Sequence, residues 1–306
     1  MRDKVERRKS QVTNSMAEAA RRLSSSISDL LASRKSTPEQ ESQGQTPLHQ
    51  AAISGNMTLL RTIFQLNRVD IDVRDSKGMT ALHYAAWQHT TEPASLLLSQ
   101  GADAAAPNYE GFTALHFACQ VGHHEMVSLL LYYGADPMVQ NQFFRTPFDL
   151  ACEYGRSKVA TMLIDSGLCR KGIVGLKNED QSCDAITTPL HLASRNGHID
   201  LCRQLLVAGC SVNRATRRGS ALHECIFHGR LDAVEFLLQA GADPELKNCQ
   251  DQTPLDLAKK HSKTAAAKTI RQKVKEAVNS VYAQALVDYN SDADNSLSFS
   301  AGDIIW

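Results

Sequence analysis

Apolar and polar positions along this chain follow a pattern that returns about every 33 residues. Each return begins with threonine or serine, then proline or alanine, then leucine or phenylalanine, then histidine or aspartate. It starts at residues 46, 80, 113, 146, 188, 220 and 253, so the intervals are 34, 33, 33, 42, 32 and 33 residues. Alanine or cysteine stands five residues after every start, and a pair of large apolar residues such as Leu97-Leu98 follows five of them. Seven copies in one phase predict an internal structural repeat.

The residue types within one copy predict two short helices. The opening threonine or serine can cap a helix, and proline is tolerated in a first helical turn. A glycine nine residues later, such as Gly122, is suited to end this first helix in the left-handed conformation. A second helix then carries the leucine pair on its apolar face, and Gly-Ala-Asp, as at 101–103, leads into a hairpin loop. One such unit cannot bury its own apolar face, so we expect the copies to stack.

The tetrapeptide Thr-Pro-Leu-His, present at 46–49 and 188–191, is similar to the signature of the ankyrin repeat. The resemblance implies an all-α solenoid of about seven repeats over residues 44–280, with starts near 46, 80, 113, 146, 188, 220 and 253. The 42-residue interval predicts an insertion near 170–185, most simply a longer loop between the fourth and fifth repeats. The last copy departs from the family pattern at Lys259, as expected of a C-terminal cap that faces solvent.

The segments on either side of the repeats have a different character. Residues 1–43 are rich in serine and basic side chains and are expected to form a disordered tail, the alternative being a partner- or membrane-binding helix. Residues 259–280 carry seven basic side chains and only Glu276 as an acid. Ile270, Val274 and Val278 lie four residues apart there, which predicts an amphipathic capping helix. Its basic face is expected to be solvated, and contact with anionic lipid is the alternative.

Residues 282–306 resemble the opening of an SH3 domain, through Ala285–Tyr289, Leu297–Phe299 and Ala301–Ile305. The resemblance implies the first part of a truncated β-barrel, so we expect the sequence to be a fragment of a longer protein. It also implies a peptide-binding groove. The candidate groove residues are Tyr289, Asp292 and Asp294. Because Val287 stands where the family has an aromatic ring, we expect the completed domain to bind proline-rich peptides weakly or not at all.

Composition narrows the function classes. The 33 basic and 33 acidic side chains cancel, which argues against a nucleic-acid partner. The sequence shows neither a signal peptide nor an apolar run of the roughly 18 residues that a membrane span needs. The eight cysteines include no Cys-x-x-Cys pair, and Cys119, Cys152 and Cys225 occupy the small position of the repeat. We therefore expect an intracellular protein whose thiols are reduced and buried, without metal or cofactor.

The histidines do not predict catalysis. Five of them are the fourth residue of the tetrapeptide, and in ankyrin repeats that imidazole ties one hairpin to the next. These are His49, His83, His116, His191 and His223. His223 and His228 flank a glutamate as in a zinc protease, but they are five residues apart and so do not share a helix face. No nucleophile, base and orienting acid can be grouped, so we expect no enzyme and no catalytic residue.

Ankyrin arrays usually bind proteins on their concave face, through hairpin loops and the ends of the first helices. Aromatic and arginine side chains there are the expected anchors. The candidates are Trp87, Tyr109, Phe143, Phe144, Tyr154, Arg217 and Phe227. Repeats followed by an SH3 segment resemble the Caskin family, which implies a cytoplasmic adaptor at the cell cortex or synapse linking signalling and cytoskeletal partners. The alternatives are an ankyrin–SH3 regulator of a transcription factor or of apoptosis, and a cortical lipid-binding adaptor.

Overall fold

The computed structural model describes residues 44–65, 69–169, 187–260 and 265–292. These residues form fourteen helices and a single isolated β-bridge between Thr216 and Gly219. They fall into two compact units, of which the first ends at Tyr109 and the second begins at Glu110. Within the described ranges the fold is all-helical, and its helix pairs follow the seven starts of the sequence repeat. The predicted ankyrin-repeat solenoid is confirmed.

The first unit contains the first two repeats. Its helices are α3 (Pro47–Ser54), α4 (Met57–Gln65), α5 (Ala81–Ala86) and α6 (Glu92–Ser99). The first helices of the two repeats, α3 and α5, pack on each other, and so do the second helices, α4 and α6. Ala51 and Ala85, which stand five residues after their starts, are fully buried, as expected of small residues that allow this close approach.

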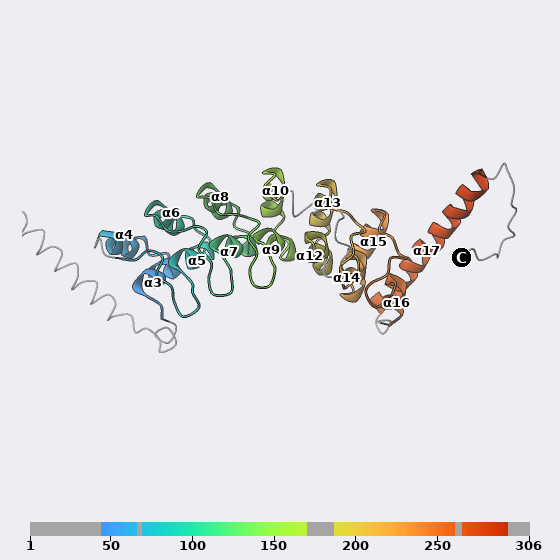
Figure 1. The fold of residues 1–306 in the computed structure, drawn as a ribbon, viewed down its shortest axis with the longest axis horizontal. Helices are drawn as coiled ribbons and strands as arrows, with labels where there is room; N and C mark the ends of the chain where they lie inside the picture. The colour runs from blue at the N-terminus through green and yellow to red at the C-terminus, as the bar shows by residue number, and fades with distance from the viewer. Residues whose placement is uncertain (1–43, 66–68, 170–186, 261–264, 293–306) are drawn as a thin grey trace, which may run out of the picture. The chain divides into compact units, whose positions relative to one another are not determined.

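The second unit contains the remaining repeats in two layers (Figure 1). One layer consists of the first helices: α7 (Ala114–Val121), α9 (Pro147–Glu153), α12 (Pro189–Asn196), α14 (Ala221–Phe227) and α16 (Pro254–Lys260). The other consists of the second helices: α8 (His124–Tyr132), α10 (Ser157–Asp165), α13 (Ile199–Val207) and α15 (Leu231–Gln239). Each helix packs on the corresponding helix of the next repeat, and leucines such as Leu130 and Leu163 are fully buried between the layers.

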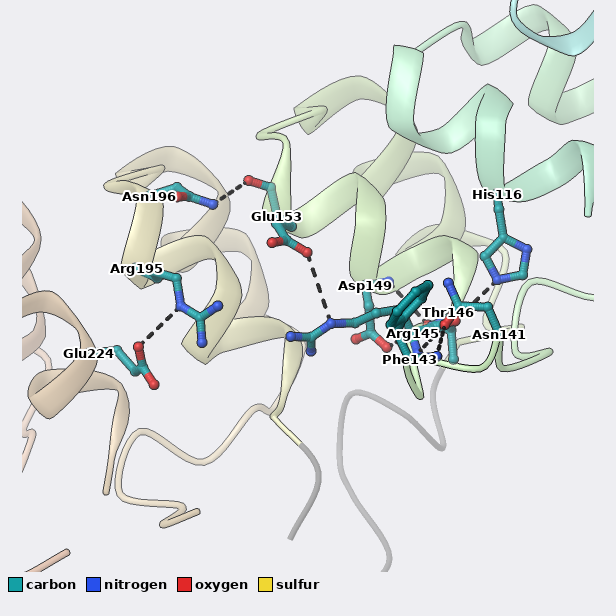
Figure 2. Close-up of polar contacts among 10 residues, drawn as sticks. All are labelled: His116, Asn141, Phe143, Arg145, Thr146, Asp149, Glu153, Arg195, Asn196 and Glu224. Atoms are coloured by element: carbon teal, nitrogen blue, oxygen red, sulfur yellow. Dashed lines mark hydrogen bonds and ion pairs between the residues drawn. The ribbon is translucent and has the colours of Figure 1, made fainter. Parts of the chain in front are cut away.

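The signature histidines close each helix start and bridge neighbouring repeats. At α7, Thr113 has the extended backbone of an N-cap, and its N–H donates to His116 Nδ1 at 3.0 Å. Because Nδ1 accepts, the ring proton lies on Nε2, which donates to the carbonyl oxygen of Arg145 in the next hairpin at 3.1 Å (Figure 2). His49, His191 and His223 make the corresponding bridges. The predicted structural role of these histidines is confirmed, and it leaves their ring nitrogens engaged.

The fourth repeat has Asp149 in place of this histidine. Its carboxylate accepts hydrogen bonds from the Thr146 N–H at 3.0 Å and from the Thr146 hydroxyl at 2.9 Å (Figure 2). Aspartate therefore caps α9 but has no second ring nitrogen to donate to the next loop. The fifth repeat is tied to the fourth at another point, where Asn196 Nδ2 and His198 Nε2 donate to the Glu153 carbonyl oxygen at the end of α9, at 2.6 and 3.2 Å. The predicted insertion near 170–185 lies outside the described residues.

The thiols that replace alanine are buried as predicted. Cys119, Cys152 and Cys225 are inaccessible to solvent, and burial raises the pKa of each thiol. A raised pKa keeps the thiol protonated and unreactive. Cys249, on the hairpin loop before α16, is the exposed cysteine of the described part of the chain.

The helix α17 (Ala265–Asp292) covers the last repeat, as predicted for the amphipathic segment at 259–280, but residues 259 and 260 belong to the end of α16. It packs on α15 and α16, and Ile270, Val274 and Val278 are buried in that contact. Lys273 Nζ lies 3.4 Å from a carboxylate oxygen of Glu235 on α15, and this ion pair is a second attachment of α17 to that helix.

The C-terminal part of α17 does not have the β structure that the SH3 resemblance implies. Its backbone continues through 285–289, the segment that resembles the opening of an SH3 domain, and it includes Tyr289 and Asp292. A single strand needs a partner for its backbone hydrogen bonds, and the described residues contain no strand for it to join. The Ala-Gln-Ala-Leu run at 283–286 has high helix propensity, so the helix is extended instead. Asp294 and the rest of the SH3 segment lie outside the described residues, as does the tail at 1–43.

We expect Val274→Ala to destabilise the attachment of α17, because it leaves a cavity in a fully buried position. The cost should be about 2 kcal/mol. Lys275→Ala, one residue along on the exposed face, is the matched control and should cost well under about 1 kcal/mol. Thermal unfolding followed by circular dichroism measures both. Equal losses for the two variants would contradict the packing of α17 through its apolar stripe.

A candidate protein-binding surface on hairpin loops and first helices

The second unit presents aromatic side chains to solvent from its hairpin loops and from the ends of its first helices. We call this the hairpin surface. Its aromatic members are Phe143 and Phe144 before α9, Tyr154 after α9, and Phe227 at the end of α14. The exposed fractions of these residues are 62, 61, 46 and 48%. Each is a candidate anchor of the sequence analysis, and each is exposed to solvent.

The loop that carries Phe143 and Phe144 is built by Asn141. The Asn141 side-chain oxygen accepts from the N–H groups of Phe143 and Arg145, at 2.9 and 3.0 Å (Figure 2). Asn141 itself is buried, so it holds the turn and is not available to a partner. Asp75 and Asn248 build the corresponding loops in the same way. These positions belong to the scaffold, although they lie in the same loops as the candidate anchors.

Phe144 has a left-handed backbone, with φ of 55°. The two preceding loops have glycine at this position, Gly78 and Gly111, because glycine adopts positive φ without strain. A bulky residue in this conformation is an outlier that costs about 1–2 kcal/mol. The chain therefore keeps a strained phenylalanine where glycine would fit, and exposes its ring. The sequence signal was available, since Phe144 breaks the glycine register of the loops.

The first unit holds two further predicted anchors. Trp87 follows α5, and Tyr109 lies on the hairpin loop at the end of the unit, with exposed fractions of 51 and 60%. The Tyr109 N–H donates to the Lys77 carbonyl oxygen at 3.2 Å, which fixes the loop on its neighbour.

The remaining candidate anchor, Arg217, belongs to the second unit. It is exposed in the loop before α14.

Sequence reasoning missed a buried glutamate beneath the hairpin surface. Glu224 on α14 is 2% exposed, and one carboxylate oxygen lies 3.1 Å from Arg195 Nε (Figure 2). The same oxygen lies 3.7 Å from His228 Nε2, and the other lies 3.3 Å from Arg218 Nε. Burial, assisted by the neighbouring arginines, lowers the pKa of His228 against the attraction of Glu224. The imidazole is therefore neutral at pH 7, and Arg195 and Arg218 supply the positive charge around Glu224.

A second ion pair joins the fourth repeat to its own hairpin. Arg145 Nε lies 4.0 Å from a carboxylate oxygen of Glu153, and both side chains are partly exposed (Figure 2). The pair spans α9 from its loop to its end. Solvent-accessible ion pairs contribute about 0–1 kcal/mol to the free energy of unfolding. We therefore expect this pair to orient the loop and to add little to the stability of the fold.

The described residues offer little for other chemistry. Their His, Cys, Asp and Glu side chains contain no group of three or more placed to hold a metal ion. Among the helices in these ranges, none is long and apolar enough to cross a membrane. The described residues do provide a stacked helical scaffold with exposed aromatic and arginine side chains. Such an arrangement defines a protein-interaction module.

Models of known families identify this module. The model described as ankyrin repeats (3 copies) matches residues 15–108, 94–171, 168–248 and 190–282. The chain belongs to the ankyrin-repeat family. It forms an ankyrin-repeat protein-interaction domain, and this fold is not typically enzymatic.

Individual relatives share parts of the chain. Human Caskin-2 is 37% identical over 125 residues, which are 40% of this chain and 10% of Caskin-2. The mouse B-cell lymphoma 3 protein homolog is 30% identical over 228 residues, which are 72% of this chain and 49% of that protein. The chain therefore spans a tenth of one curated relative and about half of the other.

Solved structures show the same fold. The ankyrin repeat domain of human ASB11 has a TM-score of 0.62 at 25% identity and covers 74% of this chain and 96% of its own. The ankyrin repeat domain of Bcl-3, described as a unique member of the IkappaB protein family, has a TM-score of 0.57 at 27% identity. It covers 75% of this chain and 99% of its own.

Proposed function

We propose that this chain is an interaction scaffold whose hairpin surface binds a protein partner, with Phe144 as a central anchor. The observation that carries the proposal is the left-handed backbone of Phe144 beneath an exposed ring. Strained residues that persist where an unstrained alternative exists are concentrated at functional sites. Aromatic rings are also among the side chains that contribute most to protein interfaces.

The neighbouring side chains fit the same role. Phe143 lies beside Phe112 of the preceding hairpin loop, with ring centroids 6.1 Å apart, so the two neighbouring loops together present an aromatic pair. Tyr154 is exposed at the other end of α9, and Arg145 and Glu153 lie along the same helix and its loop. A partner segment lying along α9 would find apolar area at both ends and charged side chains between them. This is the usual composition of a specific protein interface, with apolar anchors and polar neighbours.

The resemblance to the Caskin family implies a cytoplasmic adaptor, at the cell cortex or synapse, that brings signalling and cytoskeletal proteins together, and the 37% identity to Caskin-2 over 125 residues is consistent with that resemblance. The second candidate is a regulator of a transcription factor. Its support is the match to the B-cell lymphoma 3 protein homolog over 72% of the chain, together with the fold shared with Bcl-3, which is described as a member of the IkappaB protein family. The distribution of the fluorescently tagged chain in cells separates the two. Accumulation at the cortex favours the adaptor, and accumulation in the nucleus favours the regulator.

Replacing Phe144 by glycine tests the binding surface. We expect Phe144→Gly to keep the fold and to raise its stability by up to about 1 kcal/mol, because glycine relieves the left-handed strain. The same change removes the exposed ring and should weaken partner binding about tenfold. Tyr132→Gly removes an 85% exposed ring from α8, on the second-helix layer, and serves as the control for binding.

The measurement compares the proteins captured from cell extract by the immobilised wild-type chain and by each variant, with thermal unfolding of the same samples. Loss of specific partners with Phe144→Gly, at unchanged or raised melting temperature, is the expected result. An identical partner set for the wild-type chain and Phe144→Gly would contradict the proposed surface. A lowered melting temperature would contradict the strain on which the proposal depends.

A further inference from the structure

A groove opens at the other end of the hairpin surface, between the last two repeats. It lies between the loop before α14 and the loop before α16, and its volume is about 260 Å³. Phe227 supplies its apolar wall, and Arg217, Arg218 and Lys260 lie on its exposed rim. Glu224 lies beneath it. This volume is enough for one or two side chains of a bound peptide.

Arg218 is held in a conformation suited to receive an anion. Its guanidinium carbon lies 5.4 Å from the centre of the Phe227 ring, and its Nε lies 3.3 Å from the buried Glu224 carboxylate. The ring and the carboxylate therefore orient the guanidinium plane from two sides. Among the described residues, none accepts a hydrogen bond from its two terminal nitrogens, and the side chain is 53% exposed. A planar guanidinium with its outer edge open is the geometry that binds a carboxylate through two parallel hydrogen bonds.

The charge of the groove favours the same ligand. Its lining contains three basic side chains, Arg217, Arg218 and Lys260, and one acidic side chain, Glu224. Burial lowers the pKa of His223, so this lining imidazole adds no charge at neutral pH. The acid is buried, whereas the three bases are exposed, so an approaching molecule meets net positive charge. The whole chain is electrically balanced, which makes this a local property of the groove.

We propose that this groove binds an acidic segment of a partner protein, with an Asp or Glu carboxylate on Arg218 and a neighbouring apolar side chain on Phe227. The inference rests on the proposed function and specifies the chemistry of one partner segment. A peptide fits better than a membrane, because the apolar wall and the charges converge in a hollow between two loops. Binding to anionic lipid would require basic side chains on a protruding face.

The chain offers a matched control for Arg218. Arg203 on α13 is also exposed, and its guanidinium carbon lies 5.1 Å from the centre of the Phe236 ring. It repeats the stacked arginine–phenylalanine pair on the second-helix layer, away from the groove. Arg218→Gln and Arg203→Gln thus remove the same charge and the same stacking in two different places. Lys260→Gln is a second test variant, because it removes a rim charge without touching Glu224.

The test selects ligands for the full 306-residue chain from a phage-displayed library of random dodecapeptides. A consensus peptide is then synthesised with a fluorescent label, and its affinity is measured by fluorescence anisotropy. We expect enriched peptides to carry Asp or Glu next to an apolar residue. Arg218→Gln should weaken binding about tenfold, Lys260→Gln about threefold, and Arg203→Gln less than about twofold. Converting the peptide carboxylates to amides should weaken binding as much as Arg218→Gln does. Raised salt should reduce the difference in affinity between the wild-type chain and Arg218→Gln.

The outcomes separate this inference from the proposed function. Enriched peptides that lack acidic residues, or that bind Arg218→Gln as well as wild type, overturn the acidic groove and leave the interaction scaffold standing. Acidic peptides that lose affinity equally with Arg203→Gln show a general charge effect and overturn the groove as well. Binding only to vesicles containing phosphatidylserine, and not to peptide, assigns the basic rim to lipid and overturns the inference. If no peptide is enriched and Phe144→Gly captures the same partners as wild type, both proposals fail.

Discussion

Gly219→Ala is expected to lower the melting temperature by roughly 10 °C, which corresponds to about 3 kcal/mol for an array of this size. Gly219 has φ of +105°, a conformation that costs an alanine about 1–2 kcal/mol. A β-carbon there would lie 2.4 Å from Cγ of the His223 ring. That ring cannot move aside, because its two nitrogens bond Ser220 and the Gln252 carbonyl oxygen. The Gly219 carbonyl oxygen also accepts the bridge from His191, so any shift of the loop disturbs a second repeat.

Gly229→Ala in the same repeat is the matched control. Gly229 also has positive φ, at +67°, but a β-carbon there would meet nothing within 4 Å. The control therefore carries only the backbone strain, and its cost should be about 1–2 kcal/mol. Circular dichroism melts of the two variants and the wild type give the comparison. A Gly219→Ala variant no less stable than Gly229→Ala would show that the His223 bridge is not rigid, against the interlocking described for the repeats.

Acidification is expected to destabilise the second unit by roughly 3 kcal/mol between pH 6.5 and pH 4 through His191 alone, at 1.36 kcal/mol per pKa unit. Complete burial lowers the pKa of His191 from 6.5 to about 4, against the opposing effect of its hydrogen bond to Gly219. Below pH 6.5 the unfolded chain binds a proton that the folded chain excludes until about pH 4. The stabilising contribution of the neutral ring is therefore complete above pH 6.5 and is lost as the pH falls. Burial lowers the pKa of His223 as well, which adds in the same direction.

Melting temperatures between pH 7.5 and pH 4 measure this effect. His191→Gln should be less stable than wild type at pH 7.5 by about 2 kcal/mol, because the ring's hydrogen bonds to the Thr188 hydroxyl and to the Gly219 carbonyl oxygen are lost. It should also show a shallower loss of stability on acidification than the wild-type chain. His124→Gln, at an exposed position on α8, should keep the wild-type pH dependence. Equal pH dependence in wild type and His191→Gln would show that His191 is not buried in the neutral form.

The repeat architecture was predictable because it depends on local and periodic signals. The cap at Thr113, the fully buried Ala118 five residues after it and the left-handed Gly122 each follow from the residue type at a fixed position of the period. The apolar stripe of α17 was predictable for the same reason, since Ile270, Val274 and Val278 are spaced for one helix face. Each of these positions is decided by contacts within one repeat or with the next.

The remaining features depend on contacts that the period does not encode. The buried Glu224 is paired with Arg195 and Arg218, which come from two different repeats and are themselves ordinary surface residue types. The extension of α17 through 285–289 competes with the strand suggested by family resemblance, and helix propensity decides the backbone there. The strain at Phe144, by contrast, can be detected from the period, because glycine occupies the same position in the two preceding loops, at Gly78 and Gly111.

The aspartate at the fourth repeat bears on how unfolding spreads along the second unit. A repeat array behaves as a one-dimensional chain of units in which each interface passes stability only to its neighbours. Where a histidine of one repeat donates to the hairpin loop of the next, the two repeats are linked by this hydrogen bond as well as by helix packing. Such a pair of repeats is expected to unfold together. Asp149 lacks that bridge, and the fifth repeat is tied to the fourth through the Glu153 carbonyl at the end of α9. Partial unfolding that starts in the later repeats is therefore expected to halt at this interface, leaving the earlier repeats of the unit as a separate cooperative block.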